Sequence, residues 1–407
     1  MALNIISEAD RCLNCRNPLC KTGCPVSTRI NEIIQMFRNN QIMEAGAILF
    51  ENNPLSLVCA KVCNHEAQCT GHCVLNHKGV PVRFYEIEEY ISDTYLDRME
   101  VKIEEKKEQS AAIIGAGAAG ITVAFKLAQA GYDVTIFDEK TEIGGMMRYG
   151  IPEFRLPNSI LDRYKKKLLE YGVKIRPNTI LGGALHIADL FRDGYNSVFI
   201  GTGTWRPKAL GLVGETLANV HYGIAYLTHP DSYDLGENVA VIGMGNVAMD
   251  VARTALRHGA KKVTLYARSK RIAASEDEVE YTKLDGAAFV FGRAIEKITR
   301  QGPVFKVAVF DENDKVTAYE DELELVDADS TIIAISQGPK DALVNTTDGL
   351  KSDECGLLIT DENGKTTLDG VYAAGDVVHG SMTVVHAVHD AKIAAEAMIR
   401  YMEEKRN

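Results

Sequence analysis

Eight of the nine cysteines lie in the first fifth of the chain, in two runs whose spacing suits metal ligation. The runs are Cys12-x2-Cys15-x4-Cys20-x3-Cys24, followed by Pro25, and Cys59-x3-Cys63-x5-Cys69-x3-Cys73. Closely spaced thiolates that end in Cys-Pro are typical of iron–sulfur ligation. Two structural zinc ions, each on four thiolates, are the alternative, but the runs lack the paired C-x2-C knuckles of zinc ribbons. We therefore expect iron–sulfur chemistry here.

A glycine-rich turn follows the cysteine region. The motif Gly115-Ala116-Gly117-Ala118-Ala119-Gly120 stands between a predicted strand at 111–114 and a predicted helix at 121–129. A second strand at 132–137 ends on Asp138, which completes a βαβ dinucleotide-binding unit. The first glycine permits the turn, the second lets a pyrophosphate approach, and the third lets helix and strand pack closely. The helix N-terminus attracts phosphate, and Asp138 can accept a hydrogen bond from a ribose hydroxyl.

Three later stretches place small residues where a flat ring could pass close to the backbone. They are Gly144-Gly145-Met146, the buried strand 198–200 that ends in Gly201-Thr202-Gly203, and the strand 370–374 that ends in Gly375-Asp376. An amphipathic helix is predicted from Thr383 to Met402, and its positive end would favour an anionic reduced flavin.

A second βαβ unit begins at Asn238. Its strand leads into Gly243-Met244-Gly245-Asn246-Val247-Ala248, then a helix at 250–258 and a strand at 263–267. Where an NAD site would place an acid stands Arg268, with Lys270 and Arg271 just beyond. Cations at this point suit the 2′-phosphate of NADP, although a solvated basic loop is the alternative. We therefore favour NADP(H) over NAD(H).

Composition limits the possible classes of protein. The 407 residues carry a net charge of -11, so we expect no nucleic-acid partner. No apolar signal core opens the chain, and its apolar runs suit buried strands, so we expect a cytoplasmic protein with no membrane contact. We predict a helical iron–sulfur domain at 1–106, an FAD domain at 107–206 with 338–407, and an NAD(P) domain at 207–337.

The secondary structure that positions these motifs follows from hydrophobic periodicity. Helices are predicted at 30–37, 41–51 and 85–99, the first of them capped by Ser27 or Thr28. A charged linker is predicted at 101–110. A β-meander is predicted at 289–333, with a hairpin at 311–315.

The order of the motifs resembles the glutamate synthase small-subunit family. The resemblance rests on the cysteine octet, the two fingerprints, Gly150-Ile151-Pro152-x-Phe154-Arg155-Leu156-Pro157 and Ala373-Ala374-Gly375-Asp376-Val377-Val378, and it covers nearly the whole chain. Within that family the compact length and the C-terminal motif look most like the nicotinamide-oxidising subunits of bacterial dihydropyrimidine dehydrogenases. The resemblance implies an α/β fold: two Rossmann-like domains of the two-dinucleotide-binding type, preceded by an α-helical domain with two [4Fe-4S] clusters.

The resemblance also implies ligands, residue by residue. Cys12, Cys15, Cys20 and Cys73 would hold one cluster. Cys24, Cys63 and Cys69 would hold the other with Glu88, which leaves Cys59 as a spare thiol. Met244 to Val247 and Arg268 match NADP-phosphate contacts, but Ser269 stands where a relative has a second basic residue, so NADH stays open. The cofactor-binding residues are predicted as Gly115, Ala116, Gly117, Ala118, Ala119, Gly120, Asp138, Gly145, Met146, Arg155, Gly203, Gly243, Met244, Gly245, Asn246, Val247, Arg268, Gly375, Asp376, Thr383 and Val384.

These parts predict an FAD and iron–sulfur NAD(P)H oxidoreductase. A flavin converts between hydride pairs and single electrons, so the chain would pass electrons from NAD(P)H through the clusters to a second redox subunit docked near the iron–sulfur domain. We expect a hetero-oligomer and no catalytic acid or base; His386 and His389 fit packing or solvent roles better.

Three alternatives remain open to different degrees. A disulfide reductase would need a C-x-x-C beside the flavin, and the sequence has none beyond residue 73. A zinc-stabilised nucleotide sensor would lack iron. The large subunit of an electron-bifurcating ferredoxin–NADP oxidoreductase would carry the same motifs. The sequence does not distinguish this function from that of an NAD(P)H-oxidising subunit.

Overall fold

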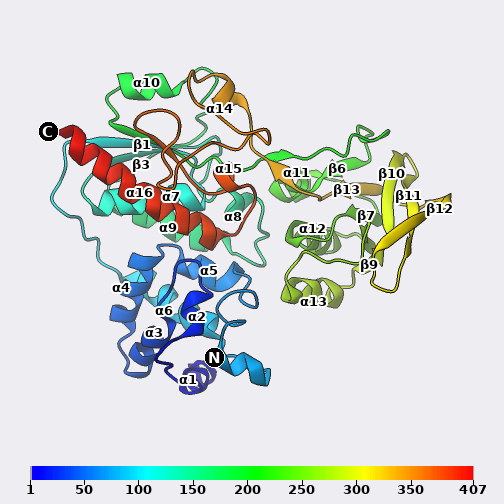
Figure 1. The fold of residues 1–407 in the computed structure, drawn as a ribbon, viewed down its shortest axis with the longest axis horizontal. Helices are drawn as coiled ribbons and strands as arrows, with labels where there is room; N and C mark the ends of the chain where they lie inside the picture. Colours follow the sequence, from blue (N-terminus) through cyan, green and yellow to red (C-terminus); the bar gives the residue numbers. More distant parts are fainter. Residues whose placement is uncertain (1, 407) are drawn as a thin grey trace. The chain divides into compact units, whose positions relative to one another are not determined.

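The computed structural model describes residues 2–406 and divides the chain into two compact units (Figure 1). Unit 1 comprises residues 2–148, 153–204 and 338–406, and unit 2 comprises residues 149–152 and 205–337. Each unit holds one of the two predicted βαβ fingerprints. The boundary that we place at residue 106, inside unit 1, stays a prediction.

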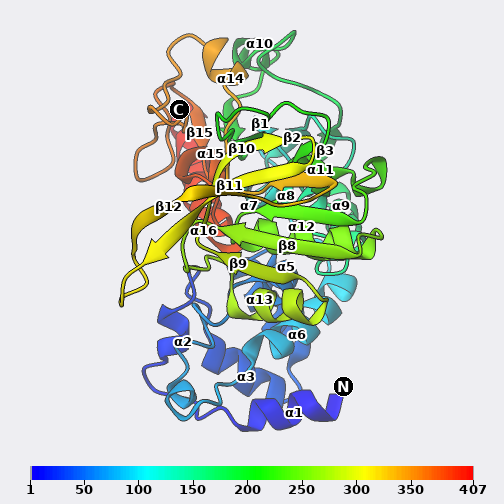
Figure 2. The same ribbon diagram turned by 90° about the vertical axis from the view of Figure 1, so that its right-hand side faces the viewer.

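The cysteine region of unit 1 is built from helices (Figure 2). They are α1 (Ala2–Asp10), α2 (Leu19–Thr22), α3 (Ile30–Arg38), α4 (Ile42–Asn52), α5 (Ser56–Val62), the 3-10 turn η1 (Val74–Lys78) and α6 (Phe84–Arg98). The apolar stripe of α3 buries Ile30, Ile33 and Ile34 in a core shared with Ile87 and Ile91 of α6. The three predicted helices therefore form, within a residue of their predicted ends.

The predicted cap of α3 is wrong. The helix starts at Ile30 with Arg29 at its N-cap, and no side chain caps it. Thr28 has another role: its Oγ1 accepts hydrogen bonds from the Cys24 thiol at 3.3 Å and from Asn52 Nδ2 at 3.3 Å. The hydroxyl is therefore occupied by a thiol and an amide instead of the helix end.

A parallel sheet forms the centre of unit 1, in the order β15-β4-β1-β2-β3. Its strands are β1 (Ser110–Ile114), β2 (Asp133–Phe137), β3 (Lys174–Arg176), β4 (Ser197–Ile200) and β15 (Val371–Ala373). Four of the five residues of β1 are buried, as expected for a parallel strand covered on both faces. Because β15 joins β4, the last strand of the chain lies in the same sheet as the first fingerprint.

Helices flank this sheet. They are α7 (Ala118–Gln129), α8 (Met146–Tyr149), α9 (Asn158–Glu170), α10 (Ile187–Arg192), α14 (Ala342–Asn345), α15 (Asp376–His379) and α16 (Val384–Arg406). Helix α16 packs along α7, and both Figure 1 and Figure 2 show it beside that helix. The predicted helices at 121–129 and 383–402 therefore form.

The helical region is joined to the sheet region by specific contacts within unit 1. The rings of Phe50 and Phe125 meet edge to face, with centroids 5.2 Å apart. Lys167 Nζ donates to the Met99 carbonyl at 3.2 Å, and Arg163 pairs with Asp93 at 2.6 Å. The cysteines are thus carried on a scaffold fixed to the first fingerprint.

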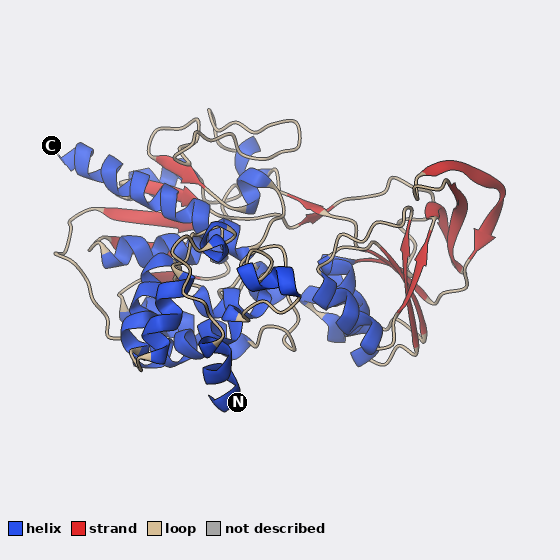
Figure 3. Ribbon diagram, turned by 60° about the horizontal axis from the view of Figure 1, so that its bottom comes forward, coloured by secondary structure: helices blue, strands red, loops and turns tan. Residues whose placement is uncertain are grey.

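Unit 2 repeats the parallel design with a smaller set of elements (Figure 3). Its sheet runs in the order β6-β13-β7-β8-β9. The strands are β6 (Val220–Tyr222), β7 (Asn238–Ile242), β8 (Lys262–Ala267), β9 (Ala288–Phe291) and β13 (Ser330–Ile333). The helical elements are α11 (Gly223–Thr228), α12 (Asn246–Arg257), α13 (Glu276–Leu284) and the 3-10 turn η2 (Pro230–Ser232).

The predicted meander is only partly a separate sheet. Strands β10 (Arg293–Thr299), β11 (Gly302–Phe310) and β12 (Val316–Leu325) form an antiparallel sheet, whereas β9 and β13 join the parallel one. Short strands β5 (Arg206–Pro207) and β14 (Gln337–Gly338) pair where the chain enters and leaves this unit.

Candidate functional site

The first glycine loop is shaped by positions that tolerate no side chain. Gly115 has φ +101°, and a Cβ there would lie 2.5 Å from the Gly201 carbonyl oxygen. A Cβ on Gly120 would lie 1.9 Å from the Gly115 carbonyl oxygen. Helix α7 starts directly after Gly117, so its free N–H groups face the loop. The backbone can therefore approach a pyrophosphate closely.

Gly145 forms the opposite wall of this loop. It has φ +51°, and a Cβ on it would lie 2.8 Å from the Gly117 Cα. The preceding Gly144 donates its N–H to the Ala116 carbonyl at 2.8 Å. The structure therefore brings the two predicted glycine stretches together, and Met146 begins α8 directly after them. A cradle that a methyl group would fill fits a flat, closely held dinucleotide.

Asp138 lies at the end of β2 and is 9% exposed. One carboxylate oxygen accepts the Lys140 N–H at 2.7 Å, and the other accepts the Ala116 N–H at 2.5 Å. Burial raises the pKa of this carboxyl group, against the lowering effect of the two backbone donors. Asp138 thus fixes the glycine loop as well as presenting an acceptor.

The C-terminal stretch returns to the same loop. A Cβ on Gly375, which has φ +77°, would lie 3.3 Å from the Ala119 Cβ. Asp376 accepts the Met382 N–H at 3.1 Å, and burial raises its pKa to about 6. Thr383 Oγ1 lies 2.6 Å from His386 Nδ1, and α16 starts at Val384.

Two predicted residues have weaker links to this cluster. Gly203 has φ +69° and precedes Thr204, whose hydroxyl lies 3.0 Å from that of Ser381. Arg155 is half-buried in the segment between α8 and α9. His389 is exposed and pairs with Asp390 at 3.0 Å, which fits its predicted solvent role.

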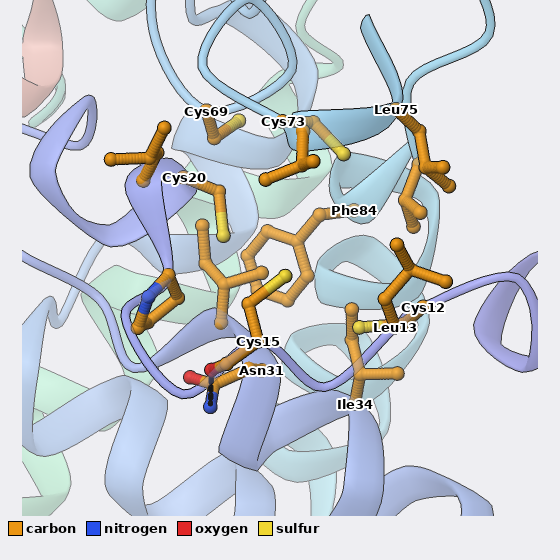
Figure 4. A pocket seen from close by; sticks show the side chains of 15 residues that line it. Cys12, Leu13, Cys15, Cys20, Asn31, Ile34, Cys69, Cys73, Leu75 and Phe84 are labelled. Carbon is orange, nitrogen blue, oxygen red and sulfur yellow. Dashed lines mark hydrogen bonds between the residues drawn. The ribbon is translucent and has the colours of Figure 1, made fainter.

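Five of the predicted ligands line one pocket in the helical region: the four assigned to the first cluster, and Cys69 of the second. Figure 4 shows Cys12, Cys15, Cys20 and Cys73 arranged around it, with Phe84 beside them. Leucine, isoleucine, valine and proline side chains make up most of the remaining lining. Burial, together with the neighbouring Cys73 and Cys12 thiols, raises the pKa of the Cys20 thiol to about 11. An apolar pocket lined by these four thiols and by that of Cys69 fits a cationic inorganic core that would keep its thiol ligands deprotonated.

A second group of thiols surrounds Glu88 of α6. Alongside burial, the negative charge of this carboxyl group raises the pKa of the Cys24, Cys63 and Cys69 thiols. The Cys59 thiol in turn raises the pKa of Glu88. Burial raises the pKa of Glu88 well above its ordinary value. No donor within residues 2–406 hydrogen-bonds to this carboxyl group, so a buried acid lies among soft ligands without a partner of its own. That donor set fits a second cluster with one oxygen ligand.

The thiol of Cys59, the predicted spare, interacts with that of Cys63, and this interaction together with burial raises the pKa of the Cys63 thiol well above its ordinary value. Cys69 also lines the first pocket, so the two thiol groups are neighbours. Across residues 2–406, no three His, Cys, Asp or Glu side chains converge closely enough to share one metal ion.

Sequence reasoning missed a bridge between the second thiol group and the flavin-side helix. Lys392 of α16 donates to Asn52 Oδ1 at 2.8 Å, and Asn52 Nδ2 donates to Thr28 Oγ1, which also accepts from Cys24. Cys24 acts electrostatically on Lys392, and Cys59 and Glu88 act electrostatically on Tyr164 of α9. Little in the sequence indicated this bridge, since Lys392 is simply a lysine within a predicted amphipathic helix.

The second glycine loop has the same turn with a more open surface. Gly243 has φ +142°, and a Cβ there would lie 2.3 Å from the Ala334 carbonyl oxygen. A Cβ on Gly245 would meet no atom within 4 Å. Helix α12 begins at Asn246, four residues before the predicted start, because the glycine turn leads directly into it. Asn246 Oδ1 accepts the Ser275 N–H at 3.0 Å, which ties the loop to α13.

The predicted cations of unit 2 separate into two kinds. Lys270 is ion-paired with Asp314 and lies 4.9 Å from the Phe310 ring centroid. Arg268 and Arg271 are exposed. The guanidinium groups of Arg268 and Arg271 are therefore accessible to a ligand. The ammonium group of Lys270 is held by Asp314 of the hairpin between β11 and β12.

Two family patterns match consecutive parts of the chain. Residues 2–100 match the family described as dihydropyrimidine dehydrogenase domain II, 4Fe-4S cluster, and residues 109–391 match the pyridine nucleotide-disulphide oxidoreductases. The glutamate synthase [NADPH] small chain of Halomonas elongata is 33% identical over 98% of this chain and 90% of its own length. The chain belongs to the glutamate synthase small-subunit family. It is an FAD and iron–sulfur NAD(P)H oxidoreductase.

Other members of this family and several solved structures are also similar. The NAD-dependent dihydropyrimidine dehydrogenase subunit PreT of Salmonella typhimurium is 33% identical over 98% of this chain and 94% of its own length. FprA of Mycobacterium tuberculosis in complex with NADPH has a TM-score of 0.60 at 18% identity, and covers 74% of this chain and 86% of its own. The thioredoxin reductase of T. acidophilum has a TM-score of 0.54 at 24% identity, with 72% and 98% covered. At these identities the structures show the shared fold. No helix within residues 2–406 has the length and apolarity that a membrane crossing requires.

Proposed function

We propose that this member of the glutamate synthase small-subunit family is the NAD(P)H-oxidising subunit of a hetero-oligomeric enzyme. It would take hydride from NAD(P)H onto FAD and pass single electrons through two [4Fe-4S] clusters to a partner subunit. One observation carries this proposal: the pocket lined by Cys12, Cys15, Cys20 and Cys73 belongs to the same compact unit as the Gly115–Gly120 loop. Bound FAD supplies the conversion between two-electron and one-electron transfer.

The residues of unit 1 have distinct tasks toward the flavin nucleotide. The Gly115–Gly120 loop and Gly145 hold the pyrophosphate, and Asp138 accepts from a ribose hydroxyl while it fixes the loop. Asp376 would accept a hydrogen bond from the ribityl chain, and the N-terminus of α16 would stabilise negative charge on the reduced ring.

The thiol groups divide the cluster ligands as the family resemblance implies. Cys12, Cys15, Cys20 and Cys73 hold one cluster, and Cys24, Cys63, Cys69 and Glu88 hold the other. Support comes from the shared pocket of the first set and from the buried carboxyl group at the centre of the second. Cys59 stays outside both ligand sets.

The positions of the two sets support a direction of electron flow. The second set interacts with Lys392 and Tyr164, which belong to helices of the flavin region. The first pocket is lined by Leu13, which is 62% exposed. Electrons would therefore enter at the second set, beside the flavin region, and leave at the first set, near the surface.

The nucleotide site of unit 2 takes NAD(P)H on the Gly243–Ala248 loop. Arg268, which is exposed at the end of β8, is the group for a 2′-phosphate, with Arg271 beside it in the sequence. This arrangement favours NADPH. The partner is of the dihydropyrimidine dehydrogenase or glutamate synthase type, because the relatives are named as subunits of those enzymes.

Anaerobic purification from the native host, with the partner retained, tests the proposal. We expect about eight irons, about eight sulfides and one FAD per chain, since each cubane cluster holds four of each. A nicotinamide should bleach the flavin, with NADPH more effective than NADH. Two zinc ions without iron would reject the redox function, and a small flavoprotein partner would instead support the bifurcating alternative.

Cysteine variants separate the two cluster sites from the spare thiols. Cys20→Ser should lose about half of the iron, and Cys63→Ser should lose the other half. The matched controls are Cys59→Ser, beside Cys63, and Cys355→Ser, an exposed thiol outside the region. Both controls should keep their full iron content, measured by colorimetric iron assay with electron paramagnetic resonance of the reduced protein. Iron loss in Cys59→Ser would contradict the ligand assignment.

A further inference from the structure

Two short stretches of the cysteine region have an unusual charge composition. Residues 11–31 and 67–85 contain Arg11, Arg16, Lys21, Arg29, Lys78 and Arg83, and neither stretch contains an aspartate or a glutamate. The chain as a whole has a net charge of -11. The positive charge is therefore concentrated locally, against the overall balance of the protein.

These two stretches also build the first pocket. Apart from Ile34, every residue that lines it comes from one stretch or the other, including Cys12, Cys15, Cys20 and Cys73. The cationic segments and the four-thiol site are thus the same part of the fold.

The pocket wall reaches the surface through large apolar side chains. Leu13, Leu19 and Val74 line the pocket and are 62%, 49% and 39% exposed. Val80, in the same loop as Val74, is 55% exposed. Apolar side chains that gather at one exposed place are typical of an interaction site.

Three of the six cations are free to meet a partner. Arg11 and Arg83 pair with Glu8, and Arg29 pairs with Glu32. Arg16, Lys21 and Lys78 form no ion pair with any residue in 2–406. Arg16 follows Cys15, Lys21 follows Cys20, and Lys78 ends the turn η1 that Val74 begins. Each free cation is therefore one to three residues along the chain from a residue that lines the pocket.

We propose that Leu13, Leu19 and Val74, rimmed by Arg16, Lys21 and Lys78, form the docking surface for a redox protein whose own surface is acidic around its electron-accepting centre. We call these six residues the docking face. The proposal rests on the proposed function, and it adds where the partner binds and what charge it carries. An apolar centre with a charged rim is the usual anatomy of a protein interface. Complementary charge raises the association rate and sets the orientation in which the two redox centres meet.

An acidic plant-type [2Fe-2S] ferredoxin is a suitable probe, because it is a strong one-electron reductant. Reduced ferredoxin is mixed anaerobically with the oxidised full chain, loaded with its cofactors and separated from its partner subunit, and flavin bleaching is followed by stopped flow. Two ferredoxins each lose one electron, and the flavin takes up two electrons with one proton from water, which gives its anionic reduced form. The second-order rate constant reports docking, without any need for a nicotinamide.

Charge reversal on the docking face is compared with charge reversal elsewhere. The test protein is Arg16→Glu/Lys21→Glu/Lys78→Glu. The control is Lys102→Glu/Lys174→Glu/Lys351→Glu, which changes the net charge equally at exposed positions outside the pocket stretches. At about 20 mM salt we expect the test variant to be slower than wild type by about tenfold or more, and the control by less than about twofold. The rate constants of the test and control variants should become equal near about 500 mM salt, where exposed charges are screened.

Several results would overturn the docking face. One is equal rates for the test and control variants at low salt, and another is a wild-type rate that does not fall as salt rises. Iron, sulfide, flavin and bleaching by NADPH and by NADH are measured first in every protein. If neither NADPH nor NADH bleaches wild type, the proposed function fails; if either bleaches wild type while the test and control variants react alike, only the docking face fails. If the charge-reversed protein does not assemble, the same rate constant is measured for Arg16→Gln/Lys21→Gln/Lys78→Gln. That rate and the salt dependence of the wild-type rate then test the docking face.

Discussion

The two glycine loops share a turn but differ in what surrounds them. In unit 1 the loop faces Gly145, and Asp138 is buried with both carboxylate oxygens hydrogen-bonded to backbone N–H groups. In unit 2 the space over Gly245 is open, and Arg268 at the equivalent strand end is exposed. The difference fits a resident cofactor in the first loop and a nucleotide that enters and leaves in the second. The following experiments challenge that comparison.

The largest contrast is expected at the last position of each loop. Gly120→Ala places a Cβ 1.9 Å from the Gly115 carbonyl oxygen, so the loop must move. We expect a loss of about 3 kcal/mol of unfolding free energy and loss of the flavin. Ala248→Gly, the reciprocal change in unit 2, should cost about 1 kcal/mol and keep the flavin. Urea unfolding and the flavin-to-protein absorbance ratio measure both. Equal flavin content in the two variants would contradict the comparison.

The pH dependence of stability should distinguish the buried acids of unit 1. The pKa of Asp376 rises from 3.8 to about 6 on folding because the carboxyl group is buried. Between these values the folded state binds more protons than the unfolded state, so stability falls as pH rises through this range. The fall amounts to about 3 kcal/mol. Asp376→Asn should remove it, measured by urea unfolding of flavin-depleted protein between pH 4 and 7. Asp348→Asn, an exposed control, should retain it.

Asp138 should contribute to both structure and binding. Asp138→Asn keeps one acceptor oxygen, so one of the two backbone donors, Ala116 N–H or Lys140 N–H, loses its partner. A buried donor left without an acceptor costs about 2 kcal/mol. We expect a lower unfolding midpoint and faster flavin loss on dilution. An unchanged midpoint would show that the loop does not depend on this carboxylate.

Arg268 should affect nucleotide choice alone. Arg268→Ala removes an exposed guanidinium group, so the unfolding free energy should change by less than about 0.5 kcal/mol. The KM for NADPH should rise about tenfold, equivalent to about 1.4 kcal/mol, while the KM for NADH stays the same. Steady-state reduction of ferricyanide with each nucleotide measures this. A parallel rise in both constants would place the residue outside the 2′-phosphate site.

The sequence predicts the parallel sheets well, for physical reasons. Strands β1 and β7 are unbroken apolar runs next to glycine turns, and both form within a residue of the expected ends. The first residue of α12 could not be predicted from apolar runs. Asn246 and Val247 look like loop residues, yet the helix begins at Asn246 because the glycine turn feeds directly into it and Ser275 fixes the asparagine side chain.

The grouping of Cys73 with Cys12, Cys15 and Cys20 came from the family resemblance and not from spacing. The structure places these four around one pocket, which Cys69 also lines, and the assignment of ligands to clusters stays a prediction. The roles of Thr28 and Lys392 could not be predicted, since they depend on packing between helices that are remote in the sequence. A threonine two residues before a helix suggests a cap, and only the tertiary structure shows that its hydroxyl accepts from Cys24 and Asn52.

The bond between Lys392 and Asn52 joins residues 340 positions apart. During translation the cysteine region leaves the ribosome long before α16 is made, and for that interval it lacks this partner. Maturation of this protein therefore has a built-in order, in which the metal-binding end is synthesised first and its final support arrives late.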